Sequence, residues 1–186
     1  MDKVNYRMVR SRRRTLGIQI ASADEVVIRA PMKMPEGEIR RFLDEKREWI
    51  EKHLEKAAQV RQARDAQGAI TGEEIRMLAG EAVKRIPEMV KRRAAEIGVT
   101  YGRITIRNQK TRWGSCSSKG NLNFNCLLML CPEEVIDYVV VHELCHRQEM
   151  NHSARFWAAV ESVCPDYRNA RKWLKQNGTA LLARMR

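Results

Sequence analysis

Hydrophobic and polar residues alternate near the start of the chain and again near its middle, which predicts short β-strands in both places. Residues 4–30 contain two segments rich in β-branched residues, TLGIQI and EVVIRAP, separated by the turn-like ASAD. Residues 104–106 and 122–126 repeat the alternation on either side of a loop rich in serine, lysine and glycine. We therefore expect strands within 4–30 and two more within 104–126.

Elsewhere the hydrophobic residues follow the period of a helix. One helical stretch runs over 36–66, and a second is expected over 71–97, with Gly98 as its stop signal. The second begins with a capping-box pattern, because a threonine at its start is followed three residues later by Glu74. Pro87 is expected to kink or divide this helix.

Three further helical stretches follow the second group of strands. CPEE at 131–134 predicts a helix start, with proline near the first turn and two acids suited to the helix dipole. Shorter helices are expected around SARFWAAVESV and YRNARKWLKQ, and NG at 177–178 is expected to end the last one. The order of strands, helices, strands and helices predicts the α+β class.

Length and composition are those of a folded protein with one domain, or one domain of two lobes. The chain has 186 residues, of which 44% are hydrophobic, and its longest apolar runs are too short to span a bilayer. The N-terminal segment contains no apolar run of the kind found in secretory signals. Five irregularly spaced cysteines favour reduced thiols, so we expect a cytoplasmic protein that does not contact a membrane.

The formal net charge is +12, which raises the question of a nucleic-acid partner. Basic residues are scattered, with runs at 10–14 and 91–93, and no run is interleaved with aromatic residues in a nucleic-acid-binding motif. The charge is better interpreted as a solvated surface or a preference for acidic partners. Nucleic-acid binding remains the alternative.

The segment VVVHELCHRQEMNHSARFW, residues 139–157, contains three of the four histidines of the chain. His142 and His146 are four residues apart, so they lie on the same face of a helix that is apolar over most of its circumference. Burying two imidazoles and a carboxylate in such a helix is costly unless they are satisfied, and a divalent metal would do so.

A third histidine strengthens this interpretation. His152 follows six residues after His146, which is far enough for the helix to end and the chain to fold back towards the metal. Asn151 is suited to the left-handed turn that we expect there. Three imidazoles leave a fourth tetrahedral position open for water.

The segment IDYVVVHELCHRQEMNHSARFW, with RWGSC upstream and PDYRNARKWL downstream, resembles the YgjP-like metallopeptidase family. That family is related to the SprT-like zinc metalloproteases and belongs to the zincin group. The resemblance covers nearly the whole chain and is most specific over 111–174. It implies a zinc-dependent peptidase with Glu143 as catalytic base and three metal ligands, His142, His146 and His152.

The resemblance also implies the organisation of the chain. We expect a single zincin-like α+β domain over 1–186, with a small β-sheet, an active-site helix and an N-terminal β-containing lobe. The N-terminal strands and long helix would occupy about 1–70, and the catalytic part about 71–186. The substrate would be a peptide or protein in extended form, and the oligomeric state stays open.

By the same resemblance, Arg112, Trp113 and Gly114 line the substrate cleft, although a structural arginine and a core tryptophan are equally compatible with the sequence. Asn125 and Tyr167 are weaker candidates for stabilising the oxyanion. Two other functions remain open: a SprT-like protease that acts near nucleic acid, and a metal-stabilised binding module with little turnover.

Related metal sites offer alternatives for the neighbouring residues. Metzincins have glycine three residues after the second histidine, where this chain has Glu149, which argues against a metzincin. Gluzincins take their third metal ligand from a glutamate on a later helix, and Glu161 is a candidate for that role. Glu149, Glu161 and Asp166 are possible hydrogen-bond partners for the ligand histidines.

His53 is expected to be a partly buried histidine with a local hydrogen bond, and Cys145 a packed residue facing away from the ligands.

Overall fold

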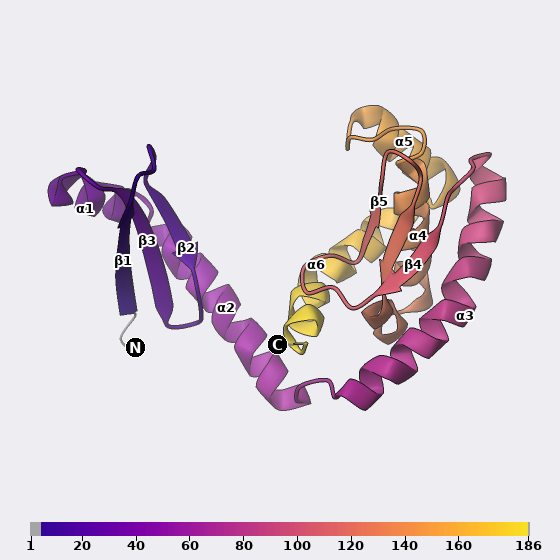
Figure 1. Ribbon diagram of the computed structural model, residues 1–186, viewed down its shortest axis with the longest axis horizontal. Coiled ribbons are helices and arrows are strands. Elements are labelled where there is room, and N and C mark those ends of the chain that lie inside the picture. The colour runs from indigo at the N-terminus through magenta and orange to yellow at the C-terminus, as the bar shows by residue number, and fades with distance from the viewer. Residues whose placement is uncertain (1–4, 186) are drawn as a thin grey trace. The chain divides into compact units, whose positions relative to one another are not determined.

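A computed structural model describes residues 5–185 and, within them, all side chains but those of residues 63, 64 and 67 (Figure 1). The chain divides into two compact units, residues 1–67 and 68–186. Each unit combines helices with one three-stranded sheet, so the predicted α+β class is confirmed. The predicted strand start at Val4 lies outside the described residues.

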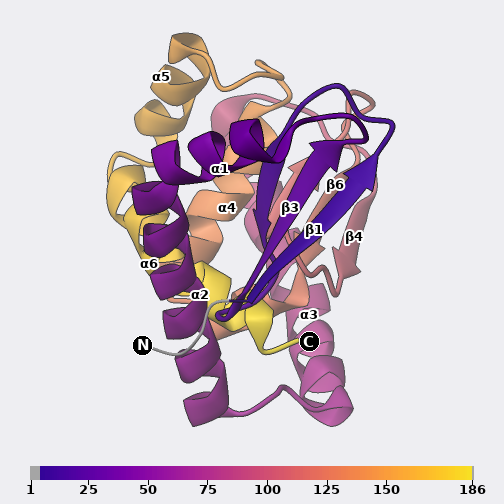
Figure 2. The same cartoon turned by 90° about the vertical axis from the view of Figure 1, so that its left-hand side faces the viewer.

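The N-terminal unit is a small sheet with two helices on one face. Its elements are β1 (Asn5–Ser11), β2 (Gly17–Ile20), β3 (Glu25–Pro31), α1 (Glu36–Glu45) and α2 (Arg47–Gln67). The central strand β3 pairs in parallel with β1 and antiparallel with β2. Figures 1 and 2 show α1 and α2 on the same side of this sheet. Their apolar residues, among them Ile39 and Ile50, bury the side chains of β3.

The helical stretch predicted over 36–66 is in fact two helices. The break falls at Lys46, whose backbone (φ −99°, ψ 7°) leaves the helical region. The sequence does not reveal the break, because the hydrophobic residues keep helical spacing on both sides of it.

The C-terminal unit is built around a buried helix, α4. Its elements are α3 (Gly72–Ile97), β4 (Ile104–Arg107), β5 (Gly114–Cys116), β6 (Leu122–Asn125), the 3-10 helix η1 (Cys126–Leu130), α4 (Glu133–Cys145), α5 (Ala154–Val163) and α6 (Tyr167–Ala183). Strand β6 is central, parallel to β4 and antiparallel to β5, so β5 is an edge strand. Helix α4 contacts α3, α5, α6 and β5, and Figure 1 shows it between α3 and α6.

The burial of α4 follows from its composition. Its hydrophobic residues point in all directions, and Val140, Val141 and Leu144 are completely buried. Burying each such side chain contributes roughly 1.5–3 kcal/mol, so the helix is firmly held in the core. The HELCH motif at its C-terminal end is therefore fixed on a rigid element.

Helix α3 begins and ends where the sequence predicts. The Glu74 backbone N–H donates to Thr71 Oγ1 (3.1 Å), and the Thr71 N–H donates to Glu74 Oε2 (2.7 Å). Gly98 ends the helix in a left-handed conformation with φ 73°. Pro87 does not divide the helix, which curves along its length in Figure 1.

The predicted end of α6 at residues 177–178 is wrong, because the helix continues to Ala183. Gly178 is buried, and a Cβ atom there would lie 3.0 Å from Nε1 of Trp113. This glycine therefore makes room for the indole ring and does not terminate the helix.

Two global features complete the fold. None of the helices in residues 5–185 combines the length and the apolar character needed to cross a bilayer. All five cysteines are free thiols.

Candidate metal centre

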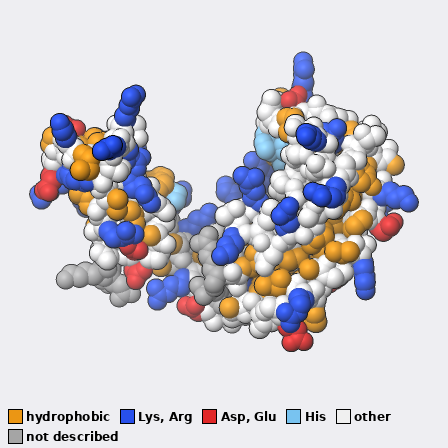
Figure 3. Space-filling view, viewed as in Figure 1, with side chains coloured by type: hydrophobic (Ala, Val, Ile, Leu, Met, Phe, Trp, Pro, Cys, Tyr) orange, Lys and Arg blue, Asp and Glu red, His pale blue; other side chains and the backbone are white. Residues whose placement is uncertain are grey.

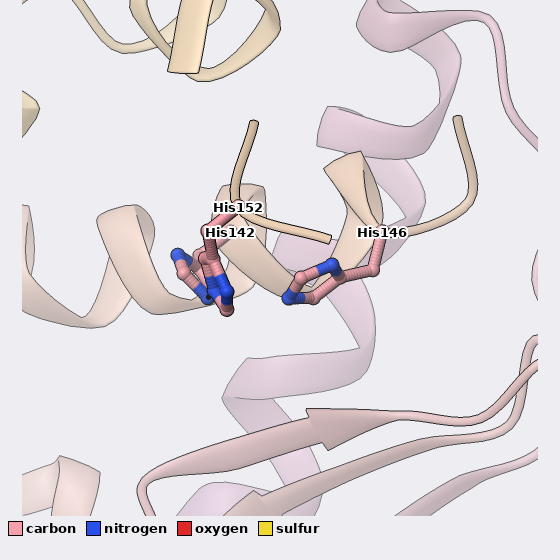
Figure 4. Close-up of side chains that lie close together, drawn as sticks. All are labelled: His142, His146 and His152. Carbon is pink, nitrogen blue, oxygen red and sulfur yellow. Dashed lines mark hydrogen bonds between the residues drawn. The ribbon is translucent and has the colours of Figure 1, made fainter. Parts of the chain in front are cut away.

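Three histidines from two segments converge beside the end of α4. His142 lies in the last turn of α4, His146 is the C-cap residue of that helix, and His152 comes from the loop between α4 and α5 (Figure 4). One ring nitrogen from each lies within 4.8 Å of the others, and Nε2 of His142 is 3.1 Å from Nε2 of His152. A tetrahedral ion with bonds of about 2.0–2.1 Å requires nitrogens about 3.3 Å apart. The donor set therefore fits a metal ion, and within residues 5–185 no other cluster does.

The turn that brings His152 back is not left-handed, contrary to the expectation for Asn151. Within residues 5–185, positive φ occurs only at glycines. Asn151 acts through its side chain instead, because its Oδ1 accepts the Ser153 backbone N–H (3.1 Å). Ser153 then caps α5 by accepting the Phe156 N–H at 3.3 Å. Two side chains with local hydrogen bonds thus fix the loop that carries His152.

The other ring nitrogens of the two helical histidines have hydrogen-bond partners. His146 Nδ1 lies 3.0 Å from the backbone carbonyl oxygen of Glu149, and His142 Nδ1 lies 3.4 Å from the hydroxyl of Tyr138. Such contacts at Nδ1 set the orientation of a ring and leave Nε2 to face a metal.

Of the three acidic residues expected to contact the ligand histidines, only Glu149 does, and the contact is made by its backbone carbonyl oxygen. The carboxylate of Glu161 forms an ion pair with Arg168 at 2.5 Å, and Asp166 lies at the N-terminus of α6 without capping it. Tyr138 was not anticipated. Its position, one helical turn before His142, is the sequence signal that could have identified it.

Phe156 packs under all three imidazoles. Its side chain is completely buried, and its ring centroid lies 4.9, 4.6 and 4.8 Å from those of His142, His146 and His152. Trp157 packs beside it, with centroids 5.1 Å apart. These two aromatic residues therefore pack α5 against the motif helix.

The surroundings keep the helical histidines neutral, which is the form that binds metals. Burial lowers the pKa of His142 to about 3, and the charges of His146, His152 and Arg171 act in the same direction. Burial also lowers the pKa of His146, although its hydrogen bond with the Glu149 carbonyl opposes this shift.

Glu143 is buried between α4 and the edge strand β5, with 6% of its surface exposed. It sits against Gly114, where a Cβ atom would lie only 2.7 Å from Glu143 Oε1. Burial raises the pKa of Glu143 to about 8, while the charge of Arg112 and a hydrogen bond from the Cys116 backbone lower it. The structure therefore brings Glu143, Gly114 and the positive charge of Arg112 together beside the histidines.

The remaining candidates have structural contacts. Asn125 is fully buried, and its Nδ2 donates to the carbonyl oxygens of Gln109 (2.7 Å) and Arg112 (2.9 Å). Trp113 is half-buried at the edge of the core. Tyr167 is buried and stacks on Trp157 with centroids 5.4 Å apart. Asn125 thus shapes the loop before β5, and Tyr167 supports the aromatic side of the site.

A helix that carries HExxH, with a third histidine folded back onto it and a glutamate alongside, is the arrangement of metal-dependent peptidases. The chain belongs to the YgjP-like family: the model of the YgjP-like metallopeptidase domain matches residues 14–83 and 72–177. It is accordingly a metallopeptidase.

The solved structures that are similar to about half of the chain include two metallopeptidase zymogens. The metallopeptidase zymogen abylysin of Pyrococcus abyssi is 22% identical with a TM-score of 0.45, over 49% of this chain and 93% of its own. The zymogen jannalysin of Methanocaldococcus jannaschii is 21% identical with a TM-score of 0.41, over 49% of this chain and 95% of its own. No curated protein is significantly similar to the chain.

Proposed function

We propose that the chain is a zinc-dependent peptidase whose metal is held by His142, His146 and His152, with Glu143 as general base. The proposal rests chiefly on one observation, the convergence of three ring nitrogens within 4.8 Å of one another. Zinc suits this donor set, because three neutral imidazoles with an open fourth position are typical of its catalytic sites. A bound zinc ion would polarise the scissile carbonyl and lower the pKa of water.

We assign the proton transfer to Glu143. It follows His142 directly, so its side chain leaves the helix about 100° away from that ligand and stays free of the metal. Burial raises its pKa to about 8, and the charge of a bound dication would lower the pKa, so the ionised form would be available near neutral pH. The carboxylate would accept a proton from the attacking water and pass it to the leaving amine.

We propose that an extended substrate binds along strand β5. It is an edge strand of the sheet and contacts α4, and its first residue, Gly114, lies against Glu143. A peptide that pairs with this edge would pass beside the histidines through main-chain hydrogen bonds. Arg112 is exposed just before the strand, where it could orient the substrate.

The substitution Glu143→Gln tests the proposal, because it removes the base and keeps nearly the same shape. We expect purified Glu143→Gln protein to contain as much zinc as the wild type and to hydrolyse a peptide library at least about 100-fold more slowly. Metal analysis and mass spectrometry of the digest, with and without a chelator, measure both. Unchanged hydrolysis in the variant would exclude Glu143 as the base, whereas zinc-loaded wild-type protein that cleaves no peptide would favour a metal-stabilised binding module.

A further inference from the structure

Arg171 on α6 lies one aromatic ring away from the histidines. Its guanidinium carbon is 4.4 Å from the centroid of the Trp157 ring. That ring is in turn 6.0 Å from the ring of His142 and 5.8 Å from the ring of His152. Stacking on tryptophan holds a guanidinium in place while leaving its N–H groups available in the ring plane.

Arg171 is exposed and has no ion pair or side-chain hydrogen bond to any of the described residues. Arg168, one turn earlier on the same helix, differs in this respect. It stacks on Tyr167 at 5.0 Å, but its charge is already paired with Glu161. The cation nearer the histidines is therefore the one that lacks an acidic partner.

A second cation borders the same site from the strand side. Arg112 is exposed, forms no ion pair within the described residues, and acts electrostatically on Glu143. Residues 68–186 contain 19 Lys and Arg against 12 Asp and Glu. Figure 3 shows histidine at the surface of the C-terminal unit with lysine and arginine side chains nearby. A carboxylate close to the site would meet a favourable potential.

We infer that Arg171 is a substrate-binding residue that recognises a carboxylate near the scissile bond, so that the site prefers acidic peptides. This inference rests on the proposed peptidase function and specifies its substrate class. A guanidinium binds a carboxylate through two parallel N–H···O bonds, which a neutral amide cannot reproduce. The carboxylate can come from a Glu or Asp side chain or from the C-terminus of the substrate.

Paired peptides separate these two sources. One series places Glu or Gln at each position around a fixed cleavage site, and the other carries a free or an amidated C-terminus. In one of the two series we expect the wild type to cleave the peptide with the carboxylate about tenfold better, as measured by kcat/KM. This preference should decrease as the salt concentration rises. Arg171→Gln should abolish the preference, and Arg171→Lys should keep part of it. Arg168→Gln is the matched control and should retain the wild-type preference.

Binding of the same peptides to Glu143→Gln protein, measured by isothermal titration calorimetry, is a second measurement that needs no turnover. Tighter binding of the carboxylate form that depends on Arg171 would support the inference even if no peptide is hydrolysed, in which case only the proposed function fails. Equal cleavage and equal binding of both members of each pair would overturn the inference and leave the peptidase function intact. A preference that survives in Arg171→Gln would overturn it as well.

Discussion

Helices α2 and α4 each carry histidine among hydrophobic residues, yet only α4 forms a candidate metal centre. On α2, Nδ1 of His53 lies 2.6 Å from the carbonyl oxygen of Trp49, and the two rings stack with centroids 3.9 Å apart. On α4, Nδ1 of His142 also contacts a residue one turn earlier, Tyr138. Both rings are thus held by their own helix, as predicted for His53. That feature alone does not make a ligand.

Helix α4 differs from α2 because two further histidines lie close to His142. His146 lies one turn further on, and His152 returns from the next loop to face both rings. Phe156 packs against all three imidazoles, and one ring nitrogen of each histidine lies within 4.8 Å of the others. His53 has only its stacked tryptophan and belongs to no such cluster within the described residues. The candidate metal site therefore depends on the fold, which brings three histidine side chains together.

The largest expected effect comes from breaking that convergence. His152→Ala removes one of three donors, and two imidazoles alone hold zinc poorly. We expect the purified variant to lose both its bound metal and its hydrolysis. His53→Ala is the matched control and should keep both, as metal analysis and peptide digestion can show. Full metal occupancy in His152→Ala would show that His152 is not a metal ligand.

A smaller effect is expected from crowding Glu143 without touching a ligand. In Gly114→Ala the new Cβ would lie 2.7–3.0 Å from three atoms of the glutamate, which must move. Displacing a catalytic group by about 1 Å can cost about 100-fold in rate, so kcat should fall by up to that factor while zinc is retained. Gly80→Ala is the control, because nothing lies within 4 Å of a Cβ atom there. Normal kcat in Gly114→Ala would remove Glu143 from the proposed mechanism.

The features that the sequence predicted correctly are those determined by neighbouring residues. The capping box of Thr71 and Glu74, the stop at Gly98 and the helical spacing of HELCH are all local. Their geometry follows from backbone preferences that act within a few residues. The ends of α3 and the helical face of the motif could therefore be identified without a structure.

The features that it missed depend on distant contacts. Helix α6 continues past Gly178, where the missing side chain makes room for the indole ring of Trp113, a residue 65 positions earlier in the chain. The prediction of a left-handed turn at Asn151 was also wrong. Its side chain stabilises the turn by accepting a hydrogen bond, and its backbone does not adopt the left-handed conformation that the sequence suggests.

The smallest of the expected effects concerns the hydroxyl group of Tyr138. Tyr138→Phe keeps the ring in the core and removes the partner of His142 Nδ1. Loss of such an outer contact typically weakens metal binding about 10- to 100-fold, and the weak 3.4 Å contact argues for the lower figure. Competition with a chelator of known affinity measures this change. Tyr167→Phe, which alters the ring stacked on Tyr138, should leave the affinity unchanged.

The most direct test of the central claim is a crystal structure of the zinc-loaded protein. We predict one ion at the end of α4, with Nε2 of His142, His146 and His152 each about 2.0–2.1 Å away and Glu143 outside the coordination sphere. An ion bound without the ring of His152, or coordinated by the carboxylate of Glu143, would contradict the account.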